Sequence, residues 1–211
     1  MDEIEIIKQL ISETEESIRF FSCGKKPDRE RSVCTAFLRC LGIGFKVSDL
    51  HINETDPPDI YFNGANFEIK EYLDDNRRRH EEYKKLLKKL KTAKKLSDLK
   101  ESYNPPRPLT IKEVCDRVTS FIEKYARNYS ENLCSTLDLM VYLNLNGYHL
   151  DDEDIPVDSS GMIKQGWRSV SIVSNSLAFT FFASESAPVF LRNVVGKIKN
   201  EWKKSGLFDL S

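Results

Sequence analysis

Two acidic residues, Asp59 and Glu68, flank the dipeptide Asn63-Gly64. Asn-Gly predicts a type I′ turn between two strands, because both central residues of that turn need a positive φ. If these two residues form the turn, Asp59 lies directly opposite Glu68 on one face of the hairpin. Their Cβ atoms are then expected roughly 4.5 to 5.5 Å apart. Two carboxylates at that distance repel each other unless a cation lies between them.

Lys70 follows Glu68 by two positions, so the two side chains are expected on the same face of the strand, while Phe67 and Ile69 point to the core. Carboxylate oxygens suit Mg²⁺ or Mn²⁺, Lewis acids that polarise a phosphoryl oxygen and make water a better nucleophile. A neighbouring lysine can orient that water or stabilise charge on phosphorus. The pattern predicts metal-assisted phosphodiester hydrolysis, with Asp59 and Glu68 as metal ligands. The alternative is a solvated strand face on which Glu and Lys alternate.

Glu30 is a further candidate for the catalytic group. Its spacing to Cys34, Phe37 and Leu41 places it on the apolar stripe of a helix expected at 28–41. A carboxylate on a buried face is costly unless it is paired or bound to a metal. The alternative is an acid in the first helical turn that interacts with the helix dipole.

Basic residues concentrate in one segment, 77–100, which has a local net charge of +8 in a chain of net charge −1. Such an element on an otherwise acidic protein is a candidate phosphate-binding surface, although a lysine-rich helix face can also be simply solvated. Arg168 either contacts phosphate or closes a salt bridge. The candidate nucleic-acid contacts are Arg77, Arg78, Arg79, Lys84, Lys88 and Arg168.

The composition indicates a folded chain of ordinary type, since 40% of the 211 residues are hydrophobic and 31% are charged. Neither a secretory signal nor an apolar run long enough for a membrane is found, so we expect a cytoplasmic protein without a membrane partner. The five cysteines lack C-x-x-C spacing and are expected to be reduced, mostly buried thiols. The usual glycine-rich nucleotide-binding and hydrolase motifs are absent from the sequence.

Hydrophobic periodicity predicts an α/β fold, with a central mixed sheet flanked by helices. One domain is expected over 1–211, with a helical layer at 1–27, a core at 28–145 and an extension with two strands and a helix at 146–211. Helices are expected at 2–21, 28–41, 75–96, 111–129 and 188–203. Strands are expected at 45–50, 59–62, 66–72, 137–145, 169–173 and 177–182, and an irregular acidic excursion at 146–166.

The stretches D-P-P-D-I-Y-F (56–62) and F-E-I-K (67–70) resemble the bipartite motif of the PD-(D/E)XK, or restriction-endonuclease-like, nuclease superfamily. The preceding helix with Glu30 resembles the position of its usual third acid. More closely, the chain is similar to a bacterial family of unknown function catalogued as a candidate endonuclease. The stretches that carry this similarity are R-E-R-S-V-C (29–34), P-P-D-I-Y-F (57–62), A-N-F-E-I-K-E-Y-L-D (65–74), L-D-L-M-V-Y-L-N-L (137–145) and Q-G-W-R-S-V-S (165–171).

The resemblance implies a restriction-endonuclease-like core in which Asp59 and Glu68 bind the metal, Lys70 is the catalytic lysine and Glu30 is an accessory acid. We therefore expect a Mg²⁺-dependent (or Mn²⁺-dependent) endonuclease that acts on DNA, or else on RNA. An isologous homodimer would suit duplex cleavage. The alternative is a catalytically silent module that keeps the fold and binds nucleic acid or protein.

Overall fold

The computed structural model describes residues 2–74, 77–100, 105–151, 156–174 and 177–201, apart from the side chain of Cys23. The chain forms two compact units. The first consists of residues 1–29 and 75–105, and the second of residues 30–74 and 106–211. The helix α2 (Lys26–Leu41) has its first turn in the first unit and the rest in the second.

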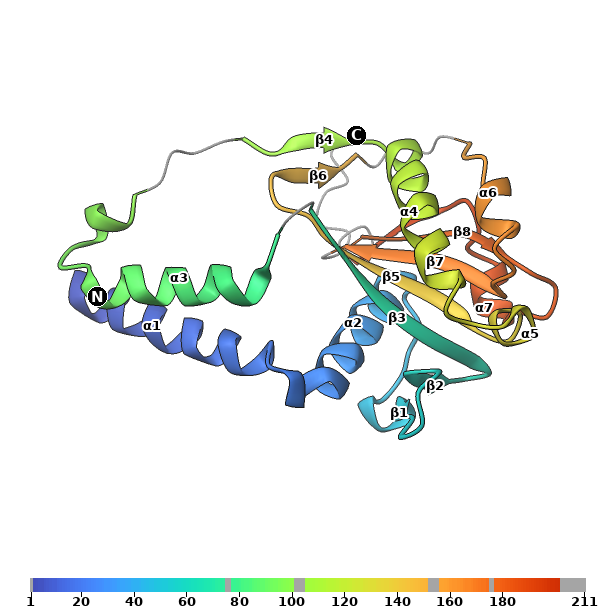
Figure 1. Cartoon of the computed structure of the whole chain (residues 1–211), viewed down its shortest axis with the longest axis horizontal. Coiled ribbons are helices and arrows are strands. Elements are labelled where there is room, and N and C mark those ends of the chain that lie inside the picture. The colour runs from blue at the N-terminus through green and yellow to red at the C-terminus, as the bar shows by residue number, and fades with distance from the viewer. Residues whose placement is uncertain (1, 75–76, 101–104, 152–155, 175–176, 202–211) are drawn as a thin grey trace. The chain divides into compact units, whose positions relative to one another are not determined.

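The first unit is built on two helices, α1 (Glu3–Phe20) and α3 (Arg79–Thr92), which run side by side (Figure 1). The ring of Phe21 stacks on that of Tyr83 with 5.3 Å between centroids, and Lys91 pairs with Glu15 at 2.7 Å. Two short 3₁₀ turns, η1 (Cys23–Lys25) and η3 (Leu96–Leu99), follow the helices. Both predicted helices are confirmed, and α3 is shorter at each end than the predicted 75–96.

The second unit is built on a seven-stranded mixed sheet with the strand order β1-β2-β3-β5-β7-β8-β9. The two central pairings, β3 with β5 and β5 with β7, are parallel, and the others are antiparallel. The strands are β1 (His51–Ile52), β2 (Ile60–Phe62), β3 (Ala65–Leu73), β5 (Asp138–Asn144), β7 (Ser169–Ser174), β8 (Leu177–Ala183) and β9 (Ile198–Asn200). The predicted α/β class, with a mixed sheet flanked by helices, is confirmed.

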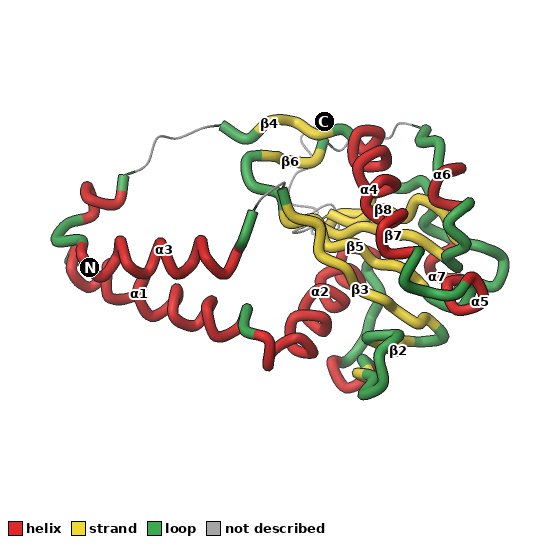
Figure 2. The backbone as a smooth tube through the Cα atoms, viewed as in Figure 1, coloured by secondary structure: helices red, strands yellow, loops and turns green. Residues whose placement is uncertain are grey.

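Helices cover both faces of this sheet (Figure 2). On one face, apolar residues of α4 (Ile111–Ala126) pack against Leu139 and Val141 of β5. On the other face, α2 packs against Phe67 of β3 and Met140 of β5. Because successive residues of a strand point to opposite faces, β5 is buried on both and reads as one apolar run.

The β2–β3 hairpin has the predicted turn and register. Asn63 and Gly64 have φ values of 44° and 80°, as a type I′ turn requires. Ile60 pairs with Phe67, and Phe62 pairs with Ala65. Because side chains alternate along a strand, these pairs determine which residues of β2 and β3 lie on the same face of the hairpin.

The predicted strand at 45–50 is wrong. The chain instead forms a 3₁₀ turn, η2 (Val47–Asp49), and only His51 and Ile52 pair as β1. The carboxylate of Asp49 accepts a hydrogen bond from the backbone N–H of Lys46 at 2.8 Å. Short acidic side chains that bond the local backbone in this way compete with strand pairing.

The predicted helix at 188–203 is also wrong. Helix α7 covers only Val189–Arg192, and β9 then pairs with β8 and forms the edge of the sheet. Between them Gly196 has a φ of 70°, which ends helical geometry, and the open edge of β8 offers the hydrogen bonds that a longer helix would have supplied. Positions 202 and 203 lie outside the described residues.

Several short elements complete the second unit. Helix α4 ends at Ala126, before the predicted 129, and α5 (Glu131–Cys134) follows. The excursion at 146–166 contains β6 (Tyr148–Leu150), parallel to β4 (Arg107–Leu109), and α6 (Ser160–Ile163). Buried free thiols were predicted and are found at Cys34, Cys40, Cys115 and Cys134, and burial raises the pKa of Cys34 to about 12. In the described part of the chain, the helices are too short or too polar to cross a membrane.

Candidate metal centre

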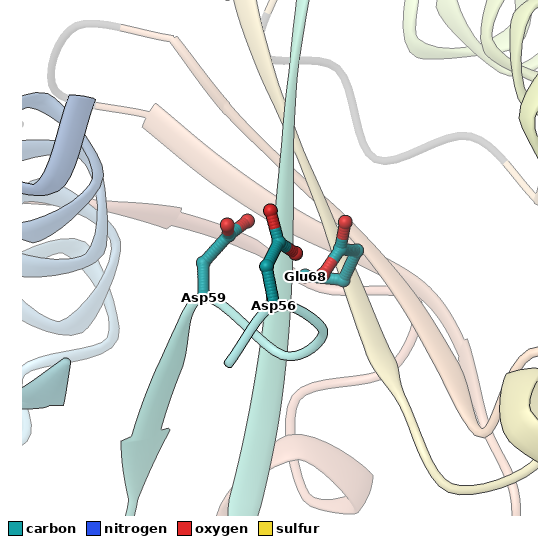
Figure 3. A group of neighbouring side chains, drawn as sticks. All are labelled: Asp56, Asp59 and Glu68. Atoms are coloured by element: carbon teal, nitrogen blue, oxygen red, sulfur yellow. The ribbon is translucent and has the colours of Figure 1, made fainter. Parts of the chain in front are cut away.

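Three carboxylates meet where β2 begins. Asp56, Asp59 and Glu68 each contribute an oxygen, and these oxygens lie within 4.8 Å of one another (Figure 3). Asp59 and Glu68 are buried, with 3% and 0% of their surface exposed, while Asp56 is exposed. An all-carboxylate set of hard oxygen donors suits Mg²⁺, Mn²⁺ or Ca²⁺. The predicted approach of Asp59 to Glu68 is confirmed.

Asp59 is held at the point where the hairpin ladder ends. Its backbone N–H donates to the carbonyl of Phe67 at 2.9 Å, so it leaves the ladder one residue before β2. Its Oδ2 accepts a hydrogen bond from the N–H of Ile69 at 2.7 Å. The side chain thus replaces a strand carbonyl as the acceptor, and this fixes the carboxylate beside β3.

Glu68 has two unlike oxygens. Its Oε1 accepts hydrogen bonds from the Lys70 ammonium and, at 2.6 Å, from the hydroxyl of Tyr129. Its Oε2 is buried and has no hydrogen-bond partner in the described chain. Burial and the charge of Asp59 raise the pKa of Glu68, against the opposing effect of Lys70 and Tyr129. A buried carboxylate that has one unsatisfied oxygen and belongs to a cluster with two other carboxylates fits a cation ligand.

Lys70 lies beside Glu68 in a partly aromatic setting. Its Nζ is 5.9 Å from the ring centroid of Tyr125 and 6.0 Å from that of Tyr129. Burial favours the neutral amine, but the hydrogen bond and charge of Glu68 outweigh it and raise the pKa of Lys70. The Lys70 side chain is therefore charged, and its ion pair with Glu68 keeps it in position. The phenol of Tyr129 stays protonated, since burial and Glu68 raise its pKa to about 12.

Asp56 was missed by the sequence reasoning. It lies in the loop between β1 and β2, which is ordered by local contacts of Asn53: the N–H of Thr55 donates to Asn53 Oδ1 at 3.3 Å, and the N–H of Asn53 donates to the carbonyl of Asp59 at 3.0 Å. The available signal was the D-P-P-D stretch itself, which carries a second acid three residues before Asp59.

Glu30 is buried on α2, with 8% of its surface exposed, as the apolar stripe predicted. It is not one of the three described acids whose oxygens come within 4.8 Å of one another. Asp56 occupies the third place in that cluster. The accessory role of Glu30 stays a prediction.

Arg168 forms a salt bridge, the second of its two predicted interpretations. Its Nε donates to Asp138 Oδ1 at 3.1 Å, and its Nη2 donates to Asp138 Oδ2 and, at 3.1 Å, to the carbonyl of Gly64. The guanidinium thereby holds the hairpin turn to the start of β5. A phosphate contact by Arg168 stays a prediction.

The predicted basic contacts on and beside α3 belong to the first unit. Arg77 donates to both carboxylate oxygens of Glu82 at 3.0 Å, and the Arg79 guanidinium lies 3.5 Å from the ring centroid of Phe21. The remaining three, Arg78, Lys84 and Lys88, are exposed, and Lys84 pairs with Glu81 at 3.2 Å. Their nucleic-acid role stays a prediction.

Comparison with known proteins assigns the chain to a family. Residues 2–203 match the family described as "Putative endonuclease, protein of unknown function (DUF1780)", and the chain belongs to that family. No curated protein matches the chain. A solved structure of a protein of unknown function from Pseudomonas aeruginosa strain PAO1, described as of the monooxygenase superfamily, is similar to it. That similarity has a TM-score of 0.65 and 29% identity, covering 95% of this chain and 96% of the other.

Proposed function

We propose that this protein is a metal-dependent nuclease that hydrolyses phosphodiester bonds of nucleic acid, with DNA as the expected substrate, on a restriction-endonuclease-like core. The observation that carries the proposal is the cluster of three carboxylates within 4.8 Å beside a paired lysine. Within it, the buried Glu68 Oε2 lacks a hydrogen-bond partner. The family description as an endonuclease supports the same reaction class.

Asp56, Asp59 and Glu68 are the residues that would hold the cation. Bound there, Mg²⁺ or Mn²⁺ would act as a Lewis acid toward a phosphoryl oxygen and the attacking water. Two of the three carboxylates are buried, and the negative charge that the cluster concentrates there would favour a divalent cation over a monovalent one.

Lys70 supplies the positive charge on the protein side. An ammonium has three N–H donors, and one is engaged by Glu68 Oε1. The others can orient the attacking water or stabilise the negative charge that develops on the phosphoryl oxygens. Because Glu68 holds the Lys70 side chain in place, the charge is positioned before substrate binds.

The monooxygenase description of the similar structure points to a different chemistry. Non-haem iron oxygenases bind their metal with two histidines and one carboxylate. The acidic cluster found in the described residues contains no histidine. Its all-oxygen donor set therefore fits a hard divalent cation better than an iron site of that kind.

The first test is metal titration into the full chain, followed by cleavage assays on single-stranded, duplex and branched DNA and on RNA. We expect cleavage to require Mg²⁺ or Mn²⁺. Lys70→Met should reduce the rate about 10²- to 10³-fold with metal binding retained, because it removes one stabilising donor. Asp59→Asn, which keeps an acceptor for the N–H of Ile69, should weaken metal binding as well as cleavage.

Glu185→Gln serves as the matched control, since it neutralises an exposed acid of the same unit outside the cluster. It should leave metal binding and cleavage unchanged. Metal binding without cleavage of any substrate would indicate a silent binding module instead. Absence of metal binding in the unmodified chain would refute the site.

Nucleic-acid binding by α3 is tested separately through charge reversal. Lys88→Glu on α3 and Lys112→Glu on α4 change the net charge equally, and both lysines are exposed. If α3 tracks the phosphate backbone, Lys88→Glu should weaken DNA binding and lower the slope of log K against log salt by about 1, while Lys112→Glu changes neither. Equal effects of the two variants would show only the influence of net charge.

A further inference from the structure

The carboxylate of Glu68 can present Oε2 to a cation only if its other oxygen is held in place. Two donors converge on Oε1, the Lys70 ammonium and the Tyr129 hydroxyl, the latter at 2.6 Å. A flexible lysine side chain fixes an oxygen less well than a donor on a rigid ring, because it has more rotatable bonds. The hydroxyl of Tyr129 is therefore the contact that can define the orientation of the carboxylate.

The ring of Tyr129 is itself held firmly. It packs edge-to-face on Trp167, with 5.4 Å between centroids, and Trp167 is only 3% exposed. The backbone N–H of Tyr129 donates to the carbonyl of Ala126 at 3.2 Å, at the turn between α4 and α5. Backbone and ring both restrict where the hydroxyl can lie.

We propose that Tyr129 is a positioning residue of the candidate metal centre: its hydroxyl fixes Oε1 of Glu68, so that the unpartnered Oε2 is left as a ligand for the cation. This inference rests on the proposed metal-dependent function and adds a residue that the nuclease motif does not contain. Partners of this kind that orient a metal ligand typically change metal affinity 10- to 100-fold when they are removed.

Tyr125 provides a matched control on the same side of the site. Its ring is 5.9 Å from the Lys70 ammonium, against 6.0 Å for Tyr129, so both rings contact the same cation equally. In the described structure only the Tyr129 hydroxyl, of these two, bonds to Glu68. Replacing each tyrosine by phenylalanine keeps both rings and removes one hydroxyl at a time.

The experiment is calorimetric titration of Mn²⁺ into the full chain, into Tyr129→Phe and into Tyr125→Phe, with the melting temperature of each metal-free protein measured in parallel. We expect Tyr129→Phe to raise the Mn²⁺ Kd about 10-fold. Tyr125→Phe should leave the Kd within about 2-fold. A purely structural role of the hydroxyl would instead lower the melting temperature while leaving the Kd unchanged.

Each outcome of the Mn²⁺ titrations supports or overturns the positioning role of Tyr129. Weaker Mn²⁺ binding in Tyr129→Phe alone supports the positioning role. An unchanged Kd in Tyr129→Phe, with the unmodified chain binding Mn²⁺, overturns the role of Tyr129 and leaves the proposed nuclease standing. Equal weakening in both variants also overturns it, because the effect would then not depend on the hydroxyl that bonds to Glu68. If the unmodified chain binds no Mn²⁺, the proposed function fails and this inference fails with it.

Discussion

Two buried acids on adjacent strands of one sheet, Glu68 on β3 and Asp138 on β5, have opposite hydrogen-bonding environments. Both are almost fully buried, at 0% and 1% exposure. Asp138 has donors on both oxygens: Arg168 on each, Ser169 at 2.7 Å on Oδ1 and the N–H of Asn66 at 2.9 Å on Oδ2. Glu68 has both of its donors on one oxygen.

This contrast separates a structural acid, Asp138, from the proposed metal ligand, Glu68. A buried charge with complete hydrogen bonding and an opposite charge is satisfied within the fold and leaves no site for a ligand. Glu68 also pairs with an opposite charge, Lys70, but its Oε2 has no donor and Asp59 is a like-charged neighbour, so one oxygen stays open to a cation. Burial alone does not distinguish the two acids, whereas counting the donors on each oxygen does.

The largest expected effect is on the structural acid. Asp138→Asn puts an amide N–H against the Arg168 guanidinium and removes its counter-charge, so we expect a loss of about 3 to 5 kcal/mol in unfolding free energy. For a domain of this size that corresponds to a melting temperature lower by about 10 °C. Thermal denaturation of metal-free protein measures it, with Glu185→Gln as the control. A shift under about 2 °C would contradict the structural reading of Asp138.

The second expected effect is stabilisation by Mn²⁺, and it tests whether metal binding is independent of Asp138. Mn²⁺ at about 100 times its Kd should stabilise the unmodified chain by about 2.7 kcal/mol, because it binds only the folded state. The Asp138→Asn variant, although destabilised, should keep this gain. Thermal denaturation with and without Mn²⁺, and again after addition of a chelator, tests it. Loss of the gain in Asp138→Asn would show that the two acids are coupled.

The smallest effect has the opposite sign. Glu68→Gln removes the repulsion from Asp59. It also removes the charge that pairs with Lys70, but burial and the repulsion from Asp59 outweigh that pairing, as the raised pKa of Glu68 indicates, and the amide oxygen can still accept from Lys70 and Tyr129. We expect the metal-free protein to gain about 1 kcal/mol of stability. Substitutions that relieve repulsion between the residues of a functional site commonly stabilise a protein while lowering its activity.

Glu68→Gln should also lose the stabilisation by Mn²⁺. Chemical denaturation of the variant, with and without metal, measures both quantities in one experiment. If Glu68→Gln destabilises the protein as much as Asp138→Asn does, Glu68 is a structural acid like Asp138.

Sequence reasoning succeeded where the signal was local. Asn63-Gly64 admits few turn types, so the register of the hairpin and the meeting of Asp59 with Glu68 followed from it. The apolar run of β5 likewise predicted a strand buried on both faces. Each of these results depends on residues that are close along the chain or on a simple period.

It failed where distant residues decide the structure. Tyr129 lies 61 positions from Glu68, and no local pattern links the two. The prediction of a C-terminal helix was wrong because residues 198–200 pair with β8 as a strand. Hydrophobic periodicity along the chain cannot reveal that a distant strand offers this pairing. Asp56 was missed because the hairpin register covers only the residues after the β1–β2 loop.

The bond from Arg168 to the carbonyl of Gly64 joins residues 104 positions apart. The turn that sets the register of the hairpin forms locally, but its attachment to the rest of the sheet needs β5 and β7, which follow the first unit's second segment in the chain. During synthesis, the hairpin carrying Asp59 and Glu68 leaves the ribosome long before its anchor. The candidate metal centre is therefore expected to form late in folding, and fragments that end before residue 168 should contain all three acids without assembling the site.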